Sequence, residues 1–138
     1  MATIEVMYNG CYGGFGFSEE AQQMYEAQGG TAKGRAVPRH DTLMIRILKE
    51  LGPERANKQS GNILFVIIPA RFADFYSISD YDGMETVVIE HDLYRAETAK
   101  DILKDESLSL AERVLRATEV LEEPFNDAIL NEERGASD

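Results

Sequence analysis

The stretch Asn9-Gly10-Cys11-Tyr12-Gly13-Gly14-Phe15-Gly16-Phe17-Ser18 joins the first expected strand of this 138-residue chain to its first expected helix. Four of its ten residues are glycine and three are aromatic. Glycine permits positive φ angles and close approach of neighbouring backbone, and aromatic rings supply contact area with few rotatable bonds. The segment, named the glycine loop below, therefore predicts either a rigid structural corner or the floor of a binding site.

Hydrophobic periodicity predicts a strand before the glycine loop and two helices after it. Residues 3–8 alternate between apolar and polar positions, as a half-buried strand does. Ser18 is a suitable helix N-cap, and the two acidic residues that follow it favour the positive end of a helix. A second helix is expected from Asp41 or Thr42 to Leu51, where a Gly-Pro pair ends it.

The middle of the chain predicts further strands. Residues 63–68 form the most apolar run of the sequence, short and rich in β-branched side chains, which favours a central strand buried on both faces. Asp82-Gly83 separates the strand-like segments 75–79 and 85–90. An Asp-Gly pair in that setting predicts a β-hairpin.

The sequence beyond His91 has helical periodicity. Ser109 and Glu112 form a capping-box pattern ahead of an amphipathic segment. Pro124 suits the first turn of a last helix. The apolar residues of that helix would anchor an interface with a second copy of the chain, and they are Phe125, Ile129 and Leu130.

These elements together predict an α+β fold. We expect a small, mostly antiparallel sheet with two packed helices, forming a core domain over residues 1–95. A C-terminal helical extension follows over residues 96–138.

Composition limits the class of function. The sequence holds 14 Lys and Arg against 25 Asp and Glu, a net charge of −11, which argues against nucleic-acid binding by phosphate neutralisation. No run approaches the roughly 18 apolar residues that cross a bilayer, so no membrane partner is expected. The single cysteine excludes an intramolecular disulfide and indicates a reducing, cytoplasmic compartment.

The glycine loop and a basic loop at residues 29–40 together predict a site for an anion. A strand, a glycine-rich turn and a helix N-terminus can point free N–H groups at a ligand, although the Walker A and dinucleotide-binding patterns are missing. If the basic loop folds over the glycine loop, the two would clamp a phosphate-bearing small molecule while an aromatic ring stacks on its base. The alternative is a structural turn beside a solvated loop. The ligand-binding residues of this hypothesis are Asn9, Cys11, Tyr12, Gly13, Gly14, Phe15, Ser18, Arg35, Arg39 and His40, with Lys33 beside them.

Patterns for catalysis and metal binding are incomplete. Cys11 could act as a nucleophile if His40 or His91 reached it, but a lone cysteine is also a small buried hydrophobe. Carboxylates near the expected hairpin could bind a divalent cation, yet they lack the full spacing of an EF-hand. We therefore predict no catalytic residue, no metal and no cofactor.

These motifs resemble an uncharacterised family found in bacteriophages and in large DNA viruses of algae and amoebae. The resemblance rests on N-x-C-Y-G-G-F-x-x-S-x-E-A from Asn9, on R-x-D from Arg39 and on D-Y-D-G-x-E-x-V from Asp80, and it covers about residues 3–91. Thr42 stands where the family has proline, and the helical segment after about residue 96 has no counterpart there. The resemblance implies a phage or viral origin and implies no activity.

We therefore expect a phage- or virus-encoded accessory protein in the cytoplasm of the host cell that acts by binding without turnover. Its partner would be a host protein or a small anionic, phosphate-bearing ligand, and its inferred origin suggests a role against host defence. One alternative is a small enzyme for a nucleotide-like substrate that uses Cys11 or the carboxylates Asp80, Asp82 and Glu85. Another is a structural component of the virion. The C-terminal helices add the expectation of a homo-oligomer.

Overall fold

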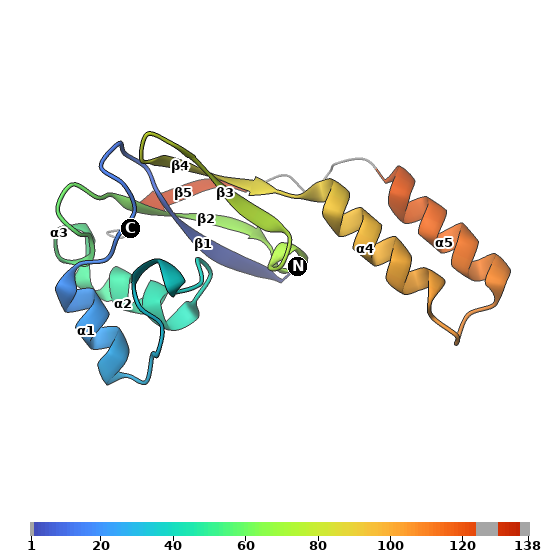
Figure 1. The fold of residues 1–138 in the computed structure, drawn as a ribbon, viewed down its shortest axis with the longest axis horizontal. Coiled ribbons are helices and arrows are strands. Elements are labelled where there is room, and N and C mark those ends of the chain that lie inside the picture. Colours follow the sequence, from blue (N-terminus) through green and yellow to red (C-terminus); the bar gives the residue numbers. More distant parts are fainter. Residues whose placement is uncertain (1, 124–129, 136–138) are drawn as a thin grey trace.

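A computed structural model describes residues 2–123 and 130–135 and shows a layered core from which a pair of helices projects (Figure 1). The strands are β1 (Thr3–Asn9), β2 (Ile63–Pro69), β3 (Tyr76–Tyr81), β4 (Met84–Ile89) and β5 (Leu130–Gly135). The α-helices are α1 (Glu19–Ala27), α2 (Thr42–Leu51), α3 (Pro53–Ala56), α4 (His91–Leu103) and α5 (Leu110–Glu122), and two 3₁₀ turns cover Gly34–Ala36 and Ala70–Phe72.

A three-stranded antiparallel sheet in the order β1-β2-β5 forms the middle layer. Tyr8 pairs with Leu64 in the register of β1 on β2. Because neighbouring side chains on a strand point to opposite faces, Met7 and Phe65 enter a cluster with the helices, whereas Val6 and Val66 enter a second cluster under the β3–β4 hairpin. The expectation that residues 63–68 are buried on both faces is confirmed.

The β3–β4 hairpin forms a separate two-stranded sheet across the second face. Its turn is Asp82-Gly83, with φ of 54° and 94°. Two consecutive positive φ angles are those of a type I′ turn, which an Asp-Gly pair adopts at low cost. The predicted hairpin and the predicted α+β class are therefore confirmed, although the strands form two sheets where one was expected.

Helices α1 and α2 pack on the first face and begin at the expected caps. The Ser18 hydroxyl accepts a hydrogen bond from the Ala21 N–H at 3.1 Å, and the Asp41 carboxylate accepts one from the Met44 N–H at 2.9 Å. Each bond satisfies an N–H that lacks a partner within the helix. In the described part of the chain, no helix is long and apolar enough to cross a membrane.

The C-terminal part differs from the prediction. Helices α4 and α5 form an antiparallel pair that begins at His91, as the helical periodicity beyond that residue predicted. The prediction of a last helix after Pro124 is wrong at Leu130. This residue begins strand β5 and pairs with Ile67 of β2. The extension over 96–138 is thus not wholly helical, because β5 returns to the sheet. Phe125 and Ile129 lie outside the described residues.

Candidate functional site

Asn9 connects three loops at the end of β1. Its side chain is fully buried, and its Nδ2 donates to the backbone oxygens of Cys11 at 2.5 Å and Gly83 at 2.7 Å. Its Oδ1 accepts the N–H of Asn62 at 2.9 Å. One amide therefore ties the glycine loop to the segment before β2 and to the hairpin turn. This role is structural, and the amide is not directed at a ligand.

A buried ion pair lies directly beneath this junction. Arg39 makes two hydrogen bonds to the Glu85 carboxylate, at 2.7 and 3.0 Å, and 14% of the Arg39 side chain and 2% of the Glu85 side chain are exposed. The carboxylate also accepts the Asn9 N–H at 2.9 Å. The guanidinium lies 3.6 Å from the centroid of the Phe15 ring, a cation–π contact. Arg39 therefore holds the glycine loop in place through Phe15, and its charge is already matched.

Glycines allow the three loops to approach closely. A Cβ on Gly13 would lie 1.6 Å from the Ser60 oxygen, and a Cβ on Gly83 would lie 2.5 Å from the Tyr12 oxygen. A Cβ on Gly61 would lie 3.3 Å from the backbone oxygen of Gly14. At Gly13 and Gly83, no other residue type fits without movement of the backbone. The glycine loop is thus a rigid corner built against two neighbours.

Cys11 is held within this corner. Its thiol donates to the Ser60 oxygen at 3.1 Å and accepts the Gly13 N–H at 3.4 Å. The two histidines considered as its base lie at the other end of the hairpin. His40 Nδ1 is 2.6 Å from the Tyr76 hydroxyl at the start of β3, and the His91 ring packs on Phe72. Six strand residues separate that end from the turn, about 20 Å, so neither histidine is placed to activate the thiol.

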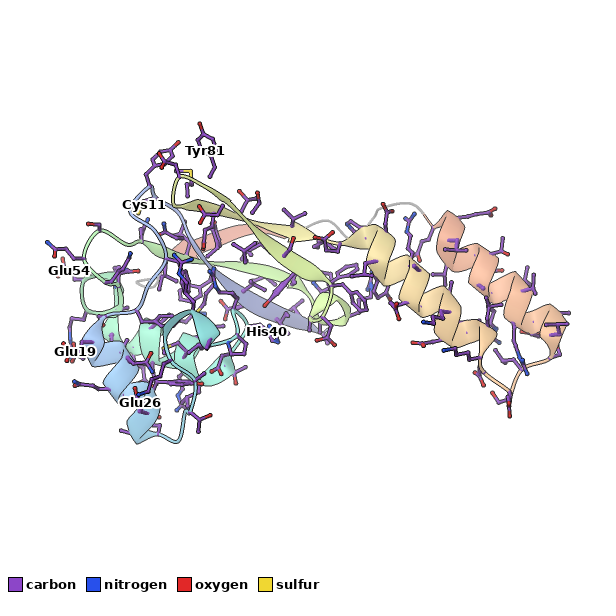
Figure 2. All side chains as sticks on the ribbon, viewed as in Figure 1. Cys11, Glu19, Glu26, His40, Glu54 and Tyr81 are labelled. Carbon is purple, nitrogen blue, oxygen red and sulfur yellow. The ribbon has the colours of Figure 1, made fainter. Side chains whose placement is uncertain are left out.

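The basic loop does not close over the glycine loop as one unit. Arg39 alone of its four basic residues contacts the glycine loop in the described structure. Lys33 and Arg35 flank Gly34, whose N–H donates to Gln22 on α1 at 3.1 Å. His40 contacts the Tyr76 hydroxyl, and Figure 2 shows it well apart from Cys11 and Tyr81. The predicted clamp of Arg35, Arg39 and His40 is therefore not assembled.

Lys58 supplies the cation that the sequence analysis missed. It is exposed, its Nζ would lie 3.4 Å from a Cβ on Gly14, and its stem crosses Gly16. Gly14 has φ of +86° and lies at the centre of the glycine loop. The position of Lys58 follows from the antiparallel pairing of β1 with β2, because such pairing puts the residues before one strand beside those after the other.

The surface of this junction combines a cation with two aromatic rings. Tyr12 and Tyr81 are exposed, and the backbone of Tyr12 touches the turn that follows Tyr81. Figure 2 shows Cys11 and Tyr81 at the same end of the molecule. The loop-end site is defined here as Tyr12, Gly14, Lys58 and Tyr81.

The remaining carboxylates and a groove lie outside the loop-end site. Asp80 accepts the Gly83 N–H at 2.8 Å as part of the turn, and no group of three potential metal ligands occurs among the described residues. A groove of about 670 Å³ separates the start of β1 from α2, with Lys49 on its wall paired to Glu5 at 2.6 Å.

Comparisons with protein-family models, with curated proteins and with solved structures found no match to this chain.

Proposed function

We propose that the protein binds a phosphate-bearing small molecule at the loop-end site, without turning it over. The observation that carries the proposal is the position of the Lys58 ammonium above Gly14, in the loop that also carries the exposed Tyr12. An ammonium beside a glycine-rich backbone is suited to a phosphate, because a residue without Cβ lets the anion approach the backbone. The exposed rings of Tyr12 and Tyr81 are suited to the flat face of a base.

Binding without turnover agrees with how the polar side chains of the site are used. Asn9, Arg39 and Glu85 are engaged with one another and with backbone groups, so they preorganise the loops. A group that must take up or release a proton in a reaction has to reach the substrate. The lysine and the two tyrosines of the loop-end site reach the surface, beside the exposed Asp82 of the hairpin turn, and these three side chains favour recognition.

The wider role follows from the family resemblance of residues 3–91. It supports a phage- or virus-encoded accessory protein that acts in the host cell cytoplasm by sequestering its ligand or by meeting a host protein. Withholding a nucleotide-like signal from a host defence system is the function that fits this origin and this site.

Native mass spectrometry of the protein purified gently from its host tests the proposal. A retained mass of a few hundred daltons is expected on the wild type and on Lys33→Met, because Lys33 lies outside the site. Lys58→Met and Tyr12→Ala should lose that mass. A clean apo mass for the wild type, combined with no heat signal on titration of AMP and ADP, would refute ligand binding, and retention in both site variants would refute the location.

A further inference from the structure

Helices α4 and α5 form an arm that the core contacts only at its base. Figure 1 shows the two helices extending away from both sheets. The arm is fixed through Tyr94, whose ring lies 4.9 Å from Phe72 and 5.4 Å from Phe75 in ring centroids. Beyond this first turn the helices pack on each other, and Arg95 donates to the backbone oxygen of Glu123.

The arm buries little apolar surface of its own. The buried residues of its two helices are Ala99 on α4 and Ala117 on α5. An isolated helix shorter than about 15 residues is marginal in water, and most helices in proteins are stabilised by packing of an apolar face. These two alanines, together with the half-buried Ile102 and Val120, supply little of that packing.

One face of the arm is apolar and exposed. Val114 and Leu121 lie three residues before and four after Ala117, and Ala96 and Leu103 have the same offsets from Ala99. At about 100° per residue, both offsets fall on the same side of the buried alanine. Because the two helices are antiparallel, equal offsets lie on one common face of the pair. Leu110 extends this face, with 72% of its surface exposed, and Leu121 has 52% exposed.

The opposite face of the arm is charged. It carries the ion pair of Arg116 with Glu112 at 3.1 Å, together with Glu119. The apolar face is defined as Ala96, Leu103, Leu110, Val114 and Leu121. Lys100 lies at its margin, and the exposed Asp92 lies at its base, because Asp92 precedes Ala99 by the same seven residues as Leu110 precedes Ala117. On a chain with a net charge of −11, a face with a single carboxylate at one end is where two copies can meet with the least repulsion.

We propose that the apolar face of the arm packs on the same face of a second copy and completes a four-helix bundle. Two-helix layers of this kind are commonly buried by another such layer, and a twofold axis makes one face complementary to itself. Two helices of 13 residues are about 20 Å long and about 10 Å apart, which gives a face of roughly 400 Å² per copy. The two copies together would bury roughly 800 Å², less than the about 1,200 Å² at which standard specific interfaces begin, so a weak dimer in exchange with monomer is expected.

Sedimentation velocity from about 1 to about 200 µM tests the proposal on the full chain. The wild type is expected to shift from its monomer mass of 15.4 kDa to twice that mass. Val114→Glu on α5 and Ala96→Glu on α4 place a carboxylate in the apolar face and should each raise the dissociation constant at least tenfold. Glu119→Lys on the charged face is the matched control and should dimerise as the wild type does.

Two results would overturn the proposal. A wild type that stays monomeric at 200 µM would refute self-association through the apolar face. If Val114→Glu then lowered the melting temperature, residues of the same chain would be the ones that pack on this face. Dimers that persist in both face variants, with helical circular dichroism retained, would place the contact elsewhere. Having the two variants on different helices keeps the test valid if one of them unfolds the arm.

Discussion

Replacing Glu85 with glutamine tests how the glycine loop is held. The change removes the negative charge that faces the Arg39 guanidinium, while the side-chain oxygen can still accept the Asn9 N–H. The guanidinium then stays buried against Phe15 with its charge unmatched. Removal of one partner from a buried pair costs about 3–5 kcal/mol, a large part of the total stability of about 5–15 kcal/mol expected for a domain.

Urea unfolding followed by circular dichroism measures this cost. With a slope of about 2 kcal/mol/M, a loss of about 4 kcal/mol moves the midpoint down by about 2 M. The double variant Arg39→Met with Glu85→Met should lose less stability than the single variants Arg39→Met and Glu85→Met lose together. The reason is that the double variant leaves no charge buried. Some loss should persist, since the Asn9 N–H would lack its acceptor, at about 1–3 kcal/mol.

The exposed pair of Arg46 and Glu50, 3.8 Å apart on α2, is the matched control. Glu50→Gln should change stability by less than about 0.5 kcal/mol. If Glu85→Gln also cost less than about 1 kcal/mol, the guanidinium would have to reach water, and the structural role assigned to the Arg39–Glu85 pair would be wrong.

Three further outcomes are expected, two at the same junction and one at the opposite end of the hairpin. Gly83→Ala should cost about 1–3 kcal/mol in urea unfolding, because its positive φ and a backbone oxygen 2.5 Å from the new Cβ both oppose it; Gly29→Ala, with a φ of +99° in open space, should cost only the strain of φ, about 1–2 kcal/mol. Asn9→Ala should free the loops and speed the reaction of Cys11 with a thiol reagent, and an unchanged rate would contradict the role given to that amide. Burial raises the pKa of the Tyr76 hydroxyl, so the folded state holds this proton more tightly than the unfolded chain, whose tyrosine pKa is about 10. The contribution of this proton to the free energy of unfolding should therefore be fully present below about pH 10 and be lost above it. The loss of stability at high pH should be smaller in Tyr76→Phe.

Local patterns sufficed for most of the elements. Strand β1, strand β2 and the hairpin turn each follow from alternation, β-branching or an Asp-Gly pair within a few residues. The caps Ser18 and Asp41 are equally local, because a side chain bonds an N–H three residues away. Prediction from sequence works where the cause lies within one turn or one strand.

The remainder depended on contacts between distant residues. Leu-Asn-Glu-Glu-Arg-Gly of β5 has little intrinsic preference for a strand, and its conformation follows from the open edge of β2. Arg39 was expected to face a ligand, because its sequence neighbours are basic. Its true partner, Glu85, is 46 residues away, and no local pattern indicates that this carboxylate is buried. Lys58 was overlooked for the same reason, since only the pairing of β1 with β2 brings it to the glycine loop.

The arm lies between two segments that are each fastened to the core. Ile89 at the end of β4 pairs with Tyr76, and residues 130–135 pair with β2. Closing a longer excursion between two fixed ends costs only about 0.6 kcal/mol for each doubling of its length. An insertion at this position therefore adds little to the entropic cost of closing the loop. A relative could carry a different segment in place of the arm, or none, while the glycine loop stays unchanged. Ligand recognition and self-association would then vary independently within one chain.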